Sequence, residues 1–295
     1  MKHSFGILCI LVSFFLVSQV IGLLVTSQYI DFSSSVNGVT VWKSLPQLGS
    51  VPFERPDVNP NVVPIYLLFG ILVGTLFVWF FSRIQSVWLW KIWFFSAVFM
   101  CLYISFFSFM NQKFALAIAL LLSALKVFRP SVIVHNLSEV FLYGGLAAIF
   151  VPMLNLFSAF TLLILISLYD AYAVWKSEHM IALAKFQMKS KLFAGLLIPY
   201  KLPSLKKVSP NVKIDHKKIK TALLGGGDIA FPLLFAATVM KSVGFWQSLI
   251  ISVSSSIALF LLIYFGKKDK FYPAMPFISA GCFVGYGIIL LIKLL

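Results

Sequence analysis

The sequence predicts an all-α, polytopic membrane protein with nine transmembrane helices, and its composition and patterning support this fold class. The chain of 295 residues is 60% hydrophobic and 11% charged, with a mean hydropathy of +0.97. A soluble domain carries about 25% charged residues, so this chain has too little polar surface to cover a soluble globule. The apolar residues form long runs, and the basic residues gather between particular runs.

Nine apolar runs are candidate spans, since a bilayer core requires about 20 mainly apolar residues per helix. The first run continues well past Ser18 without an Ala-x-Ala cleavage site, so we expect a retained span rather than a removed signal peptide. The fourth and fifth runs are short. The expected spans are residues 5–27, 63–82, 87–109, 114–128, 139–154, 157–176, 221–240, 246–265 and 274–294.

The distribution of basic residues predicts the orientation of the chain. With the N-terminus in the cytoplasm, 19 of the 24 Lys and Arg residues fall on the cytoplasmic side, as expected for a membrane protein. Nine spans then place the C-terminus outside, and an even number would break this alternation. The same clustering explains the net charge of +15 without nucleic acid as a partner. The predicted environment is the lipid bilayer.

Two long loops divide the predicted membrane domain. Residues 31–62 are polar and proline-rich and lack helical periodicity, which predicts a non-helical extracytoplasmic segment. Residues 177–220 form a basic cytoplasmic loop, in which residues 180–198 are a candidate interfacial helix or an extension of the sixth span. The predicted organisation is a six-helix part at residues 1–176, the loop at 177–220 and a three-helix part at 221–295.

Two acidic residues, Asp170 and Asp228, lie inside apolar runs, where carboxylates are costly and usually functional. Asp170 is six residues before Lys176, and Asp228 is eight residues after Lys220. At 1.5 Å per helical residue, these spacings correspond to depths of about 9 and 12 Å from the same membrane face. Two carboxyls at one depth predict a pair that shares a proton, which is the chemistry of an aspartyl protease.

The residues beside the two aspartates suit a catalytic use. Gly225, Gly226 and Gly227 directly precede Asp228, so no side chain blocks one approach to its carboxyl and the helix start is loosened. A peptide backbone can therefore come close. Tyr169 precedes the other aspartate and is a candidate to hydrogen-bond or to shape the pocket.

A third signal is the sequence Pro273-Ala274-Met275-Pro276 at the start of the last span. Two prolines three residues apart remove backbone donors and disfavour a regular helix. Irregular backbone at membrane depth is tolerated only inside protein or beside a wet cavity. The alternative is an ordinary helix start, where proline is common in the first turn.

Tyr169-Asp170, Gly225-Gly226-Gly227-Asp228 and Pro273-Ala274-Met275 resemble the YD, GxGD and PAL motifs of the presenilin and signal peptide peptidase family of intramembrane aspartyl proteases. With the nine-span plan, the resemblance covers most of the chain. It implies that Asp170 and Asp228 are the catalytic pair and that the segment at 273–275 helps to position the substrate and the active site. Gly226 departs from the leucine common at its position. Met275 replaces the leucine of PAL, a volume-conserving change.

The resemblance also carries expectations about context. The inward N-terminus is similar to presenilin, and the small size is similar to archaeal and microbial members, which implies a multi-pass protein of a prokaryotic cell membrane. Single-span membrane proteins or signal-peptide remnants are the implied substrates. No cofactor is expected, and the spacing of His and Cys residues indicates no metal site. The oligomeric state is left open.

A proton- or ion-coupled secondary transporter is the alternative function, because transporters also use intramembrane carboxylates. That function predicts an inverted repeat with broken helices in both halves. Gly and Pro interruptions occur only in the C-terminal third, and the first five spans carry no matching acidic site. We therefore favour the protease.

Other polar and small residues receive structural interpretations. Glu139, at the start of the fifth span near His135, is predicted to be an interfacial charge favoured by a helix N-terminus. Gly144-Gly145 and the pair Gly281 and Gly285 are predicted to be close helix contacts.

Overall fold

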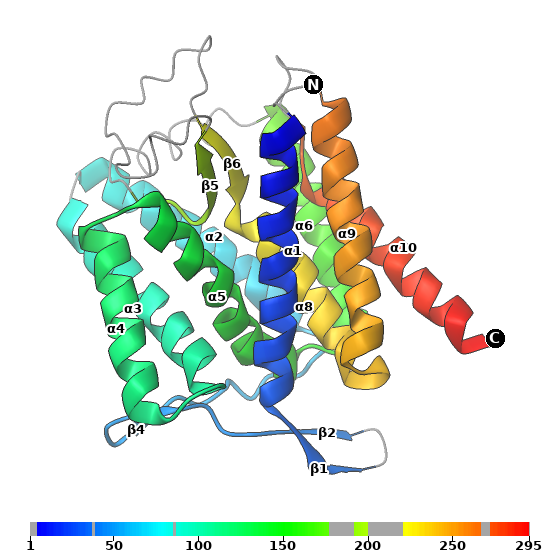
Figure 1. Cartoon of the computed structure of the whole chain (residues 1–295), viewed down its shortest axis with the longest axis horizontal. Coiled ribbons are helices and arrows are strands. Elements are labelled where there is room, and N and C mark those ends of the chain that lie inside the picture. Colours follow the sequence, from blue (N-terminus) through cyan, green and yellow to red (C-terminus); the bar gives the residue numbers. More distant parts are fainter. Residues whose placement is uncertain are drawn as a thin grey trace.

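A computed structural model of the chain describes residues 5–36, 39–84, 87–176, 192–199, 221–266 and 272–294. Nine long α-helices run through this part (Figure 1), which confirms the predicted fold class. Eight are long and apolar enough to cross a membrane, and α4, with 17 residues, is the shortest of the nine. The helices are α1 (Phe5–Gln28), α2 (Val63–Ile84), α3 (Val87–Phe107), α4 (Gln112–Phe128), α5 (Val132–Phe150), α6 (Leu156–Lys176), α8 (Gly226–Val243), α9 (Phe245–Phe265) and α10 (Met275–Leu294).

Three two-stranded antiparallel sheets accompany the helices in the described residues. Two of them lie within the predicted loop at residues 31–62. The third lies at the opposite end of the bundle, near the start of α1 (Figure 1). The strands are β1 (Ile30–Val36) with β2 (Val39–Trp42), β3 (Gln47–Leu48) with β4 (Val51–Pro52), and β5 (Gly195–Pro199) with β6 (Thr221–Gly225).

The third sheet corrects two boundaries. Residues 221–225 were expected to begin the seventh span, yet they form β6, and α8 begins only at Gly226. Residues 195–198, part of the candidate interfacial helix, form β5, while residues 180–191 of that candidate lie outside the described part. The strands pair from Gly195 with Gly225 to Pro199 with Thr221. Pairing with β5 satisfies the backbone groups of residues 221–225, whereas Gly226 and Gly227 already belong to α8.

The fifth helix also differs from its expected bounds of 139–154. It begins at Val132, because Ser131 caps it with a side-chain oxygen that accepts the Val134 N–H at 3.2 Å. It ends at Phe150, and a 3₁₀ turn at Val151–Met153 contains a proline. The early start places two additional turns of α5 beside the third sheet.

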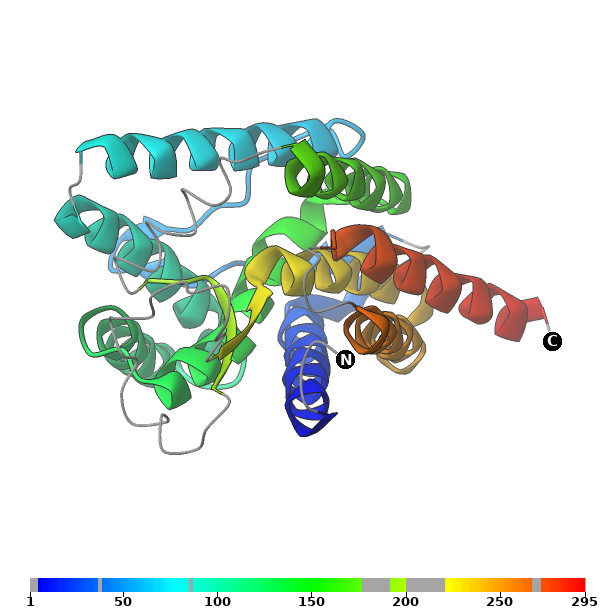
Figure 2. The same cartoon turned by 90° about the horizontal axis from the view of Figure 1, so that it is seen from above.

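Helix α8 lies in the middle of the bundle, where it contacts α1, α5, α6, α9 and α10 (Figure 2). Ten of the eleven side chains from Ala230 to Met240, together with Ile229, are buried. The protein therefore surrounds α8 along most of its length, and the position of its first turn depends on several neighbouring helices.

The segment at 31–62 is anchored to the helix ends although it contains no helix. Tyr103 of α3 donates a hydrogen bond to the Gln47 carbonyl at 2.8 Å, and Arg55 donates to the carbonyls of Lys43 at 2.8 Å and Ala148 at 3.2 Å. Just before the segment, Tyr29 donates to the Ile104 carbonyl at 2.7 Å. Burial raises the pKa of the Tyr29 hydroxyl and lowers the pKa of the Arg55 guanidinium. These contacts fasten the segment to α3 and α5.

Both predicted glycine contacts are confirmed, and the first involves α5. A Cβ added at Gly144 would lie 2.8 Å from Cγ2 of Val25 in α1, and one added at Gly145 would overlap the carbonyl oxygen of Cys101 in α3. Helix α5 therefore approaches its two neighbours through a side on which it lacks side chains.

The second contact predicts a difference in stability between two glycines of α10. A Cβ at Gly285 would lie 2.8 Å from the backbone Cα of Ile251, whereas one at Gly287 meets nothing within 4 Å. We expect Gly285→Ala to lower the thermal midpoint in detergent, by a destabilisation of about 1–3 kcal/mol. The matched control Gly287→Ala should be neutral or slightly stabilising, because alanine favours helix. Equal midpoints for the two variants would contradict close packing of α9 and α10.

Candidate active site

Asp170 contacts the segment that begins the last helix. Its carboxylate accepts the Met275 backbone N–H at 3.0 Å. Met275 is the first residue of α10, where backbone N–H groups have no partner within the helix. Pro276, the next residue, has no backbone N–H, so it leaves no donor unpaired in this first turn. The start of α10 thus offers a free amide and a favourable dipole to the carboxylate.

A second polar contact lies one turn away and fixes the same two helices. The Ser167 hydroxyl donates to the Ser279 hydroxyl at 2.9 Å. Ser167 precedes Asp170 by three residues, and Ser279 follows Met275 by four, so both contacts lie along one seam between α6 and α10. This seam holds the Asp170 carboxyl at the start of α10.

Asp228 lies in the first turn of α8, directly after the third sheet. Gly225 is the N-cap residue with φ −63° and ψ 146°. A Cβ added at Gly225 would lie 3.2 Å from an Asp228 carboxylate oxygen, so the absence of a side chain leaves room beside that oxygen. Gly227 is exposed and Asp228 is partly exposed. The carboxyl is thus reachable, as the glycine sequence predicts.

The bundle places the two aspartates on neighbouring helices. Asp170 comes from α6 and Asp228 from α8, and these helices are in contact. Pro273 is buried, and Ala274 is partly buried near the Asp170 carboxylate. Tyr169 is 39% exposed, so its ring is not enclosed in this region.

The prediction for Glu139 is wrong. The side chain is fully buried, forms an ion pair with Lys126 of α4 and accepts a hydrogen bond from the Tyr143 hydroxyl. Lys126 is buried with it. The spacing of His135, Glu139 and Tyr143 by four residues places them on one helix face, and this pattern was the signal available in the sequence.

The same face of α5 holds β5 in place. His135 Nε2 is 2.7 Å from the Gly195 carbonyl oxygen. The Asn136 amide pairs with Leu197 in both directions, donating to its carbonyl at 2.7 Å and accepting its N–H at 2.9 Å. Because β5 pairs with β6, these bonds also locate the strand that leads into Asp228.

Gln19 of α1 is a further polar residue that sequence reasoning missed. Its Nε2 donates to the Ile229 carbonyl oxygen at 2.8 Å inside the protein. The first turn of α8 is therefore held by α1 from one side and by α5 from another. A single glutamine within an apolar run carries no periodic signal that would reveal this contact.

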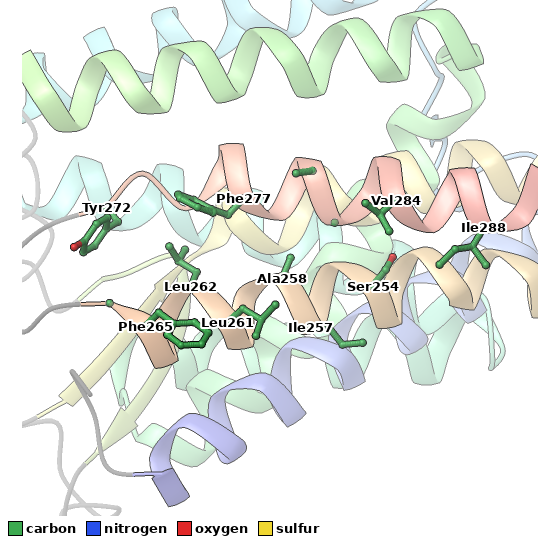
Figure 3. Close-up of a pocket in the computed structure, with 13 residues that line it drawn as sticks. Ser254, Ile257, Ala258, Leu261, Leu262, Phe265, Tyr272, Phe277, Val284 and Ile288 are labelled. Carbon is green, nitrogen blue, oxygen red and sulfur yellow. The ribbon is translucent and has the colours of Figure 1, made fainter.

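An apolar groove of about 530 Å³ lies between α9 and α10 (Figure 3). Its lining includes Leu262, Phe265, Tyr272 and Phe277 and contains neither aspartate. The groove is therefore separate from the two carboxyls. Within the described residues, no three His, Cys, Asp or Glu side chains are gathered as metal ligands.

An apolar helical bundle with a carboxyl on each of two contacting helices fits the class of membrane-embedded aspartyl proteases. Residues 12–294 match the family described as "Signal-peptide peptidase, presenilin aspartyl protease", and the chain belongs to this family. It is an integral, multi-pass membrane protein that acts as an intramembrane aspartic endopeptidase. Neither the family nor the fold supports the transporter alternative.

Solved structures share this fold. A presenilin family intramembrane aspartate protease in space group C222 has a TM-score of 0.63 and 19% identity, covering 97% of this chain and 99% of that one. A presenilin family intramembrane aspartate protease in space group P2 gives a TM-score of 0.62 and 18% identity, covering 99% of each chain. No curated protein sequence matches the chain significantly.

Proposed function

We propose that Asp170 and Asp228 are the catalytic pair of this protease. The observation that carries the proposal is their arrangement: Asp170 is held by the Met275 amide, and the partly exposed Asp228 lies in the first turn of α8, a helix that contacts α6. Both carboxyls lie at helix N-termini, where negative charge is favoured. Each is thus held in place by protein backbone while remaining open to a reactant.

The chemistry follows from two carboxyls that share one proton. The ionised carboxyl removes a proton from a water molecule, whose oxygen attacks the carbonyl carbon of the substrate. The neutral carboxyl donates a hydrogen bond to the carbonyl oxygen and protonates it as the tetrahedral intermediate forms. When the C–N bond breaks, the leaving nitrogen takes up the proton that the pair gained from water, and a hydroxyl of the intermediate returns its proton to the other carboxylate as the carboxylic acid forms. The two carboxyls titrate as a unit, so they exchange roles through the cycle.

The third sheet is a candidate docking site for the unwound substrate. A helical substrate must expose its backbone before it is cut, and the freed groups then need partners inside a membrane. Strand β6 pairs only with β5 among the described residues, and Leu223 within it is 47% exposed. Because β6 leads directly into the three glycines, a substrate strand added to its free edge would pass close to Asp228.

The proposed substrates are single-span membrane proteins or signal-peptide remnants with helix-weakening residues near the cut. Their cleavage sites are expected in the third of the span nearest to the end of the bundle that carries β5 and β6. The basic residues support an orientation in which this end and the N-terminus face the cytoplasm. A prokaryotic, archaeal cell membrane is the proposed location. Mapping the cut bonds of a single-span reporter by mass spectrometry tests this depth.

Hydrolysis also requires water at the carboxyls, which predicts a contrast between two positions near α10. In a background without native cysteines, Ala274→Cys should react with a charged thiol reagent, because Ala274 is partly exposed beside Asp170 and thiolate formation needs water. The control Ile278→Cys, at a fully buried position, should be protected. Protection of both positions would contradict a wet site.

A further inference from the structure

A fully buried group of polar side chains lies beneath the start of α8. Lys126 of α4 is 1% exposed, Glu139 of α5 is 0% exposed and Tyr143 of α5 is 3% exposed. Lys126 donates to one carboxylate oxygen of Glu139, and the Tyr143 hydroxyl donates to the other. We call these three residues the buried triad.

The buried triad is costly unless each of its members is satisfied. Removing two opposite charges from water costs roughly several kcal/mol per ion. This desolvation penalty is offset only when the ion pair has good geometry and further hydrogen bonds. The Tyr143 hydroxyl supplies such a bond, so its hydrogen is committed to Glu139. Its oxygen is thereby held in one place, and the opposite side of that oxygen faces α8.

The group that faces the Tyr143 oxygen is Gly226. A Cβ added at Gly226 would lie 2.8 Å from that oxygen, which is closer than real Cβ contacts come. On its other side, Gly226 donates its backbone N–H to the Ala194 carbonyl at 3.1 Å. The first residue of α8 is thus confined between the hydroxyl and the chain that precedes β5.

We infer that Tyr143 is a positioning residue for catalysis, and that Gly226 is required because the Tyr143 hydroxyl occupies the space of its side chain. The buried triad holds the hydroxyl, the hydroxyl sets the position of Gly226, and the Asp228 carboxyl follows two residues later in the same helical turn. This inference rests on the proposed catalytic role of Asp228. It also accounts for a glycine at the variable position of the motif.

The test is a double-mutant cycle between Tyr143→Phe and Gly226→Ala. The full-length proteins are assayed for kcat and KM on a single-span reporter, and for affinity toward a peptide with a hydroxyethylene group at the cut bond. Such a peptide mimics the transition state and reports the geometry of the carboxyl pair. Tyr103→Phe is the matched control, since it removes another buried hydroxyl, which donates to the Gln47 carbonyl at 2.8 Å far from the aspartates.

We expect each single variant to lower kcat and the affinity for the peptide mimic, with little change in KM. The double variant should be no worse than Gly226→Ala alone, because removing the hydroxyl makes room for the added methyl group. The coupling between the two positions should be at least about fivefold in kcat. Tyr103→Phe should match wild type in both readouts.

Additive effects in the cycle, or a Tyr143→Phe variant as active as Tyr103→Phe, would overturn the inference. Full activity in an Asp228→Asn variant would instead overturn the proposed catalytic role, so the two failures are distinguishable. If Tyr143→Phe does not accumulate as folded protein, the double replacement Lys126→Met with Glu139→Gln takes its place. It removes the carboxylate that fixes the hydroxyl, so the hydroxyl can move aside for the added methyl group, and the loss caused by Gly226→Ala should again become smaller.

Discussion

Replacing Asp228 with Asn is expected to abolish cleavage of a single-span reporter while the protein still folds. Asparagine has nearly the same shape but cannot exchange a proton, and loss of general acid–base catalysis alone costs about 10²–10⁴ in rate. Asp170→Asn should have the same effect. Turnover of purified variants is measured beside their elution as folded protein and their thermal midpoint.

Asp57→Asn is the matched control for both variants. Asp57 is exposed in the segment at 31–62, which lies at the other end of the bundle from the third sheet (Figure 1), so this change should leave the rate unaltered. If either Asp170→Asn or Asp228→Asn retained a rate within a few-fold of wild type, the paired-carboxyl mechanism would be wrong.

Lys126→Met should destabilise the protein far more than Lys113→Met, the replacement of the other lysine in α4. Removing Lys126 leaves the Glu139 carboxylate buried, with the Tyr143 hydroxyl as its remaining hydrogen-bond donor among the described residues. Removing one member of a buried ion pair costs about 3–5 kcal/mol. The expected result is a large fall in the thermal midpoint in detergent, or failure to accumulate as folded protein.

Lys113→Met is the control on the same helix, because Lys113 is exposed at the start of α4 and its replacement should change little. The double variant Lys126→Met with Glu139→Gln should recover much of the lost stability, since no unpaired charge remains buried. Equal midpoints for Lys126→Met and Lys113→Met would contradict the burial of the ion pair.

Much of the architecture could be predicted from the sequence. A hydrocarbon environment requires helices that satisfy their own backbone groups, so long apolar runs correspond directly to α1 and to the other helices. The two aspartates stand out for the same reason: charged groups are rare in such runs. Their similar spacing from flanking lysines, six and eight residues, placed Asp170 and Asp228 at a similar predicted depth, and the two prolines marked the start of α10.

The remaining features depend on which surfaces meet in three dimensions. Local propensity could not distinguish the start of α8 from β6, because that choice depends on pairing with β5 some 26 residues earlier in the chain. The burial of Glu139 depends on Lys126 lying opposite it on another helix, and an isolated carboxylate near a helix start has the same sequence pattern whether it is paired or solvated.

Composition and periodicity alone determined that this chain is a helical membrane protein with two carboxyls suited to share a proton. Only the tertiary structure decided how those carboxyls are held. The Met275 amide reaches Asp170 across α6 and α10, and the Tyr143 hydroxyl fills the space beside Gly226 across α5 and α8. Sequence patterns describe one helix at a time, whereas these contacts arise between faces of different helices, whose packing fixes the distances.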